Sequence, residues 1–152
     1  MAEEPARLVA VLGYSRTRGR GLSTDAFSWI GSLSGQMLFS PPNVAGWDES
    51  RWLDTATFRG RWIAANYSLA EDEIDPQAGT YDVSEDAGAA VATALGFWGT
   101  PQITPETRDR LLAFSTRCQT AMNARWKQQS YRALRQNALR MLVATSPDMQ
   151  TC

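Results

Sequence analysis

The sequence contains no histidine and only two cysteines, Cys118 and the C-terminal Cys152, among its 152 residues. Without histidine the chain has no imidazole general base, no Ser-His or Cys-His nucleophile pair and no imidazole metal ligand. Two cysteines are too few for a disulfide framework or a four-thiolate zinc site. We therefore expect no metal site and no cofactor, and we favour a chain that is not an enzyme by itself.

Long apolar runs are also missing, since no stretch approaches the roughly 18 apolar residues that a membrane span requires. The start, Met1–Pro5, has no basic segment followed by an apolar one, so it does not resemble a secretory signal. With 43% apolar and 20% charged residues, the composition is typical of a soluble globular protein. The length predicts a single domain over residues 1–152 that buries roughly two-thirds of its unfolded surface.

The charges are unevenly distributed although the net charge is only −1. Residues 69–107 contain eight acids and no base, while residues 108–152 contain eight bases and two acids. We interpret the two segments as solvated faces that can lie near each other in the fold, and residues 70–83 as an acidic internal linker. A weaker alternative is nucleic-acid binding by basic residues with interleaved aromatic ones. The residues for that alternative are Arg125, Lys127, Arg132, Arg135 and Arg140, with Trp126 and Tyr131.

Apolar residues recur at helical spacing, and no segment shows the sustained alternation that marks a half-buried strand. The predicted fold class is all-α, with about five helices packed around one core. Capping side chains and prolines mark where the helices begin and end. The predicted starts are Pro5, Ser23 or Thr24, Asp54 or Thr55, Ser84, and Thr104 with Pro105, and a last helix begins after Asn123 and stops at Ser146-Pro147.

The segment between the second and third predicted helices is the most informative part of the sequence. Two prolines favour an extended backbone there, a glycine permits a positive φ, and two tryptophans add large rigid side chains. These residues predict a loop that is held in one shape and that leads into the third helix. The motif comprises Pro41, Pro42, Asn43, Val44, Gly46, Trp47, Trp52, Asp54 and Arg61.

The loop has three possible roles. In a scaffold, its tryptophans and Trp62 fill a core between helices, and Arg61 bonds to loop carbonyls or to a carboxylate. The third helix then directs the stripe Phe58, Trp62, Ala65 and Leu69 inward. In a binding site, an exposed Trp47 or Trp52 stacks on a sugar or an aromatic ring of a ligand, while Asp48, Asn43 and Arg61 hydrogen-bond its polar groups. In a hydrolase, Asp48 and Asp54 are weak candidates for the acid and base.

The loop and the chain's ending together resemble the bacterial domain-of-unknown-function family numbered 1800. The first motif is Leu38-Phe39-Ser40-Pro41-Pro42-Asn43-Val44-Ala45-Gly46-Trp47, followed by Arg51-Trp52-Leu53-Asp54-Thr55 and Arg61. The second is the closing segment Ala138 to Gln150, in which a helix runs into Ser-Pro, an acid, an apolar residue and Gln. Both motifs occur in the order that the family shows.

The resemblance implies an exported or cell-envelope location and a sulfatase-like partner protein, and it brings no established reaction. It covers about the last third of the family's usual length, so it implies that this chain is a C-terminal fragment of a longer family domain. The missing N-terminal part of that domain is a second candidate partner. We therefore expect a structural or interaction module of an exported or cell-surface bacterial protein. The alternative is a carbohydrate-related binder or hydrolase that uses Trp47, Trp52, Asp48, Asp54 and Arg61.

Overall fold

The computed structural model describes residues 24–35, 43–46, 54–82, 84–121 and 128–150. Every regular element within these ranges is a helix, so the all-α fold class is confirmed. The chain divides into two compact units, Met1–Glu71 and Asp72–Cys152, at a point inside the predicted acidic linker. The single domain and the linker stay predictions, and the helix expected to begin at Pro5 lies outside the described residues.

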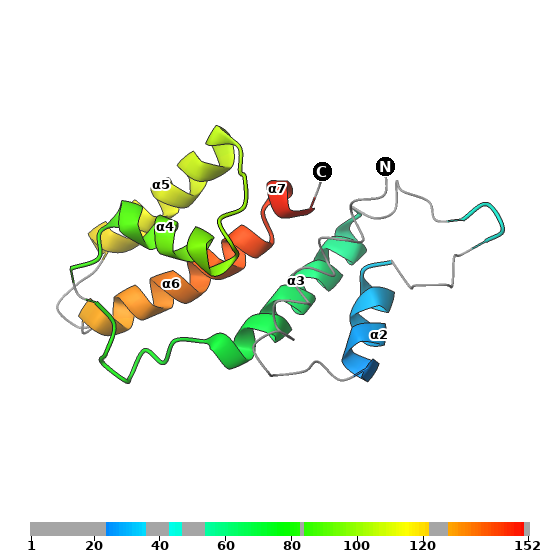
Figure 1. The fold of residues 1–152 in the computed structure, drawn as a ribbon, viewed down its shortest axis with the longest axis horizontal. Coiled ribbons are helices and arrows are strands. Elements are labelled where there is room, and N and C mark those ends of the chain that lie inside the picture. Colours follow the sequence, from blue (N-terminus) through cyan, green and yellow to red (C-terminus); the bar gives the residue numbers. More distant parts are fainter. Residues whose placement is uncertain (1–23, 36–42, 47–53, 83, 122–127, 151–152) are drawn as a thin grey trace. The chain divides into compact units, whose positions relative to one another are not determined.

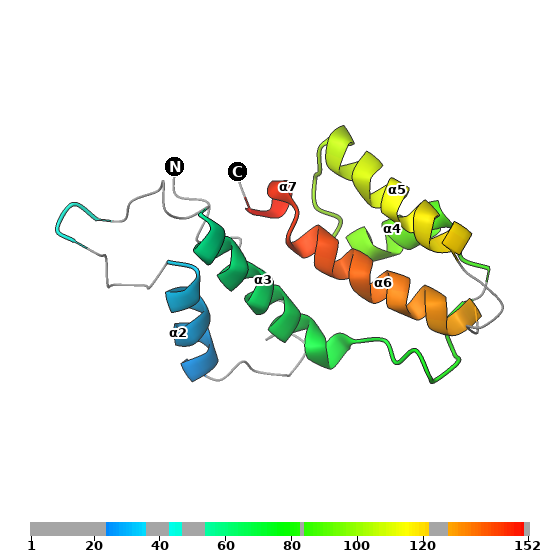
Figure 2. The same ribbon diagram turned by 180° about the vertical axis from the view of Figure 1, so that it is seen from behind.

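The first unit contains α2 (Thr24–Leu33) and α3 (Thr55–Leu69), which pack side by side (Figures 1 and 2). The two backbones come very close at Gly60 of α3. A Cβ atom at this position would lie 2.3 Å from the carbonyl oxygen of Leu33, a distance that real Cβ atoms do not reach. Glycine at position 60 is therefore what permits α3 to cross α2 at this separation.

The start of α3 follows from the sequence as predicted. Asp54 has extended backbone angles, and its Oδ1 accepts a hydrogen bond of 2.8 Å from the backbone N–H of Thr57. The Thr57 hydroxyl donates to the same carboxylate and to the Asp54 carbonyl. This N-cap satisfies a backbone donor that the first helical turn leaves without a partner.

The face that α3 buries is not the one that its apolar spacing predicts. Phe58 and Trp62 are 44% and 43% exposed, whereas Arg61 is only 3% exposed. The side of α3 that packs inward consists of small or polar residues together with this arginine. The expected core stripe is thus wrong for Phe58 and Trp62. The reason is the close contact at Gly60, because helices that approach so closely leave no room between them for aromatic rings.

The second unit packs α4 (Ala87–Phe97), α5 (Pro105–Ala121) and α6 (Gln128–Ala144) against one another, with the short α7 (Pro147–Gln150) after them. Its core contains Ala90, Val91, Ala94, Leu95, Leu111, Leu139 and Val143. Trp98, Ile103, Phe114, Leu142 and Met149 pack against this core and are partly buried. Apolar residues from all three long helices therefore meet in one cluster.

The ends of these helices match the predictions with two exceptions. Pro105 is the first residue of α5, and the Thr104 hydroxyl accepts from the N–H of Thr107, as predicted. The cap of α4 is Asp86 and not Ser84, because the Asp86 carboxylate reaches the N–H of Ala89 at 2.7 Å. α6 ends at Ala144, just before the predicted stop, and Pro147 begins α7, since its fixed φ suits a first helical position. Across the described ranges no helix is both long and apolar enough to cross a membrane.

Gly60→Ala is expected to destabilise the first unit, because the added methyl group meets backbone that cannot move away easily. Overpacking of this kind costs roughly 1–3 kcal/mol. Gly96→Ala is the matched control, since a Cβ at position 96 of α4 meets no atom within 4 Å. This control is expected to stabilise the chain by up to about 1 kcal/mol through helix propensity. Thermal and urea unfolding of both variants measures the two effects, and an equal response at both positions would contradict the close crossing.

Candidate functional site

The predicted loop is described only at its centre, residues 43–46. The N–H of Gly46 donates to the Asn43 carbonyl at 3.1 Å, and the Asn43 side chain accepts from the N–H of Ala45 at 2.8 Å. Gly46 has φ of +98°, a conformation that its lack of a side chain permits. The segment is therefore a tight turn closed by its own asparagine. The motif residues Pro41, Pro42, Trp47, Asp48 and Trp52 lie outside the described part of the chain.

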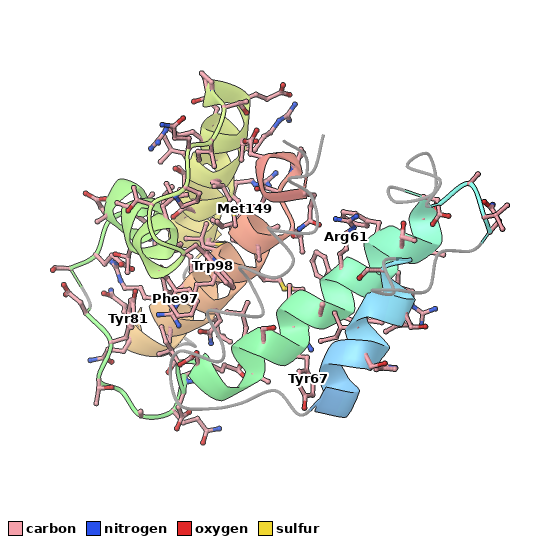
Figure 3. The ribbon with its side chains drawn as sticks, turned by 45° about the vertical axis from the view of Figure 1, so that its right-hand side comes forward. Arg61, Tyr67, Tyr81, Phe97, Trp98 and Met149 are labelled. Atoms are coloured by element: carbon pink, nitrogen blue, oxygen red, sulfur yellow. The ribbon has the colours of Figure 1, made fainter. Side chains whose placement is uncertain are left out.

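The two remaining motif residues lie on α3 with different tasks. Asp54 caps the helix, so one of its carboxylate oxygens already accepts from Thr57. Arg61 is buried two turns further along the helix, and Figure 3 marks its position on α3. Both observations agree with the scaffold interpretation of these two residues. They give no support to Asp54 as a general acid or base, and the pairing with Asp48 stays a prediction.

The outward face of α3 combines aromatic and basic side chains. We define this face as Thr55, Phe58, Arg59, Trp62 and Asn66, all of which are exposed. It joins two large aromatic side chains with one cation, and α3 contains no acidic residue at all. On the flank toward α2, Tyr67 meets Trp29 edge to face with ring centroids 6.5 Å apart.

In the second unit, an acidic connector precedes α4. The structure describes it at residues 72–82 and 84–86, and its backbone is hydrogen-bonded to side chains of α6. Asn137 accepts from the N–H of Ile74 at 3.0 Å and donates to the Ile74 carbonyl at 2.9 Å, so its side chain pairs with the backbone like a neighbouring strand. The Ser130 hydroxyl donates to the Pro76 carbonyl, and Arg140 donates to the Asp72 carbonyl at 2.9 Å. The basic C-terminal helix and the acidic segment therefore lie side by side, as their charges suggest.

Glu85 is the centre of this contact. Its Oε2 accepts from Arg135 Nη2 at 3.1 Å in an ion pair whose side chains are 8% and 1% exposed. Its Oε1 accepts from the hydroxyls of Tyr81 at 3.0 Å and Thr93 at 3.3 Å. The same arginine nitrogen also reaches the backbone carbonyls of Glu85 and Asp86. Sequence spacing could not reveal this network, because its members come from the connector, α4 and α6.

Aromatic side chains cover the C-terminal half of α6. The guanidinium of Arg140 lies over the Phe97 ring with its carbon 4.2 Å from the ring centroid. The indole N–H of Trp98 donates to the Arg140 carbonyl at 2.9 Å, and the rings of Phe97 and Trp98 meet edge to face. Figure 3 shows both aromatic residues beside α6. This arrangement ties the end of α4 to α6 through a cation–π contact and one polar bond.

These contacts bear on the nucleic-acid alternative. Arg132 and Arg135 are buried in the second unit, and Arg140 is bound to the connector and to Phe97. Buried guanidinium groups are not available to a phosphate backbone. The other members of that proposed surface, Arg125, Trp126 and Lys127, lie outside the described residues. Arg135 and Arg140 therefore hold the connector and α4 to α6, and the described arginines of α6 do not form a basic surface.

The closing motif has a structural explanation in the second unit. Asp148 Oδ2 accepts from the N–H and the hydroxyl of Thr104, at 3.0 and 3.1 Å, and so supports the start of α5. Met149, labelled in Figure 3, packs on the core, and Gln150 donates to the Ala144 carbonyl at the end of α6. The acid, the apolar residue and the glutamine of this motif therefore fasten the chain end to two helices.

Metal and thiol chemistry find no support in the described residues. Within those ranges no three His, Cys, Asp or Glu side chains gather closely enough to hold a metal ion. Cys118 is half-buried on α5 with a free thiol, and burial raises its pKa above the ordinary value, an effect that the charges of Arg135 and Arg117 oppose. The thiol is therefore protonated at neutral pH, as expected for a small packing residue.

Arg135→Met is expected to destabilise the chain strongly, because it removes the buried counter-charge and hydrogen bonds of Glu85. Breaking one side of a buried pair costs roughly 3–5 kcal/mol. Arg110→Met is the matched control, since Arg110 forms a 3.7 Å pair with Glu106 on the same helix in full solvent. That exposed pair contributes little. Urea unfolding compares the variants, and equal stabilities would show that Glu85 does not depend on Arg135.

The raised pKa of the Tyr81 hydroxyl predicts that the chain loses stability at alkaline pH. Burial, and after it the neighbouring carboxylate of Glu85, raise the pKa of the Tyr81 hydroxyl above its ordinary value. Above pH 10 or so, the unfolded chain loses this proton while the folded chain keeps it. The contribution of Tyr81 to the free energy of unfolding is therefore fully present below that pH and declines as the pH rises. Unfolding free energies at pH 8 to 11 should fall less steeply for Tyr81→Phe, and identical slopes would contradict the assignment.

The chain was compared with known proteins by family and by structure. The model of the family described as protein of unknown function, DUF1800, matches residues 3–151. Neither the curated proteins nor the solved structures contain a significant match. The family match spans nearly the whole sequence, including the turn at Asn43–Gly46, α3 and the closing motif. The chain therefore belongs to the DUF1800 family.

Proposed function

We propose that this chain is a structural or interaction module of an exported or cell-surface bacterial protein, and that the outward face of α3 packs against a second polypeptide. The observation that carries the proposal is that α3 does not bury the side that its apolar spacing predicts. This helix directs Phe58 and Trp62 outward while it buries Arg61. The exposure of these two large aromatic side chains is explained if another chain covers them.

The composition of this face favours a protein partner. Interface centres are enriched in aromatic residues and arginine and depleted in lysine and acids. Phe58, Trp62 and Arg59 fit that pattern, and no carboxylate lies on α3. The positive charge of Arg59 further favours an acidic group on the partner. The family resemblance suggests two candidates, namely the N-terminal part of the family domain and a sulfatase-like protein.

The carbohydrate alternative has less support among the described residues. It requires Asp54 and Arg61 to face a ligand together with Trp47, Trp52 and Asp48. Asp54 is engaged as the cap of α3, and Arg61 is buried. We therefore place the interaction module first.

Trp62→Gln tests the proposal with the N-terminal part of a family domain produced as a separate chain. Because Trp62 would be a central aromatic contact, its loss should weaken binding at least about 30-fold, which corresponds to about 2 kcal/mol. The thermal midpoint of the free chain should change little, since this side chain is 43% exposed. Titration calorimetry measures the affinity and circular dichroism the midpoint.

Leu134→Gln is the control, because Leu134 is equally exposed on a helix of the other unit. It should leave the affinity unchanged. A sulfatase-like protein is titrated in parallel to separate the two candidate partners. If neither partner binds, or if Trp62→Gln and Leu134→Gln have equal effects, the outward face of α3 is not the interface. A large loss of folding in Trp62→Gln alone would instead identify Trp62 as a core residue of this chain.

A further inference from the structure

We draw no further inference here: the strongest candidate, the surface patch formed by the half-exposed rings of Trp29 on α2 and Tyr67 on α3, carries none because nothing in the part of the chain that the structure describes shows what covers it.

Discussion

The ion pair between Glu85 and Arg135 is the interaction on which the second unit depends most. It lies out of water, and it brings together the connector, the start of α4 and the middle of α6. The same helix binds the rest of the connector through Asn137, Ser130 and Arg140. The acidic segment is thus a packed part of the second unit from Asp72 onward, and one of its carboxylates, Glu85, is buried and paired. A buried pair of this kind specifies one arrangement more than it adds net stability.

The first unit follows a different principle. Its two helices meet through a glycine and small residues, so their contact is tight but buries few large apolar side chains. Phe58 and Trp62 consequently remain outside, where they gain little from burial. The same geometry explains why Arg61 lies on the inner side of α3. A packing choice at Gly60 therefore produces both the buried arginine and the aromatic face.

The two motifs on which the family resemblance rests have local structural roles wherever the structure describes them. Asn43 and Gly46 close a turn, and Asp54 caps the helix that follows. Asp148 and Gln150 bind the last turn of the chain to α5 and α6. Residues of this kind shape the backbone around them.

The sequence by itself determined the features that depend on near neighbours. Helical spacing predicted the all-α class, Asp54 and Thr104 predicted helix starts, and Gly46 permitted the positive φ that the structure shows. The opposite charges of the middle and the end allowed these segments to lie near each other, but as solvated faces, whereas the structure buries Glu85 and Arg135. Only the tertiary structure decided which face of α3 is buried, that Asp86 and not Ser84 caps α4, and that Glu85, Tyr81 and Arg135 converge. Caps and turns are set within about four residues, whereas burial and ion pairing depend on which distant backbone comes close.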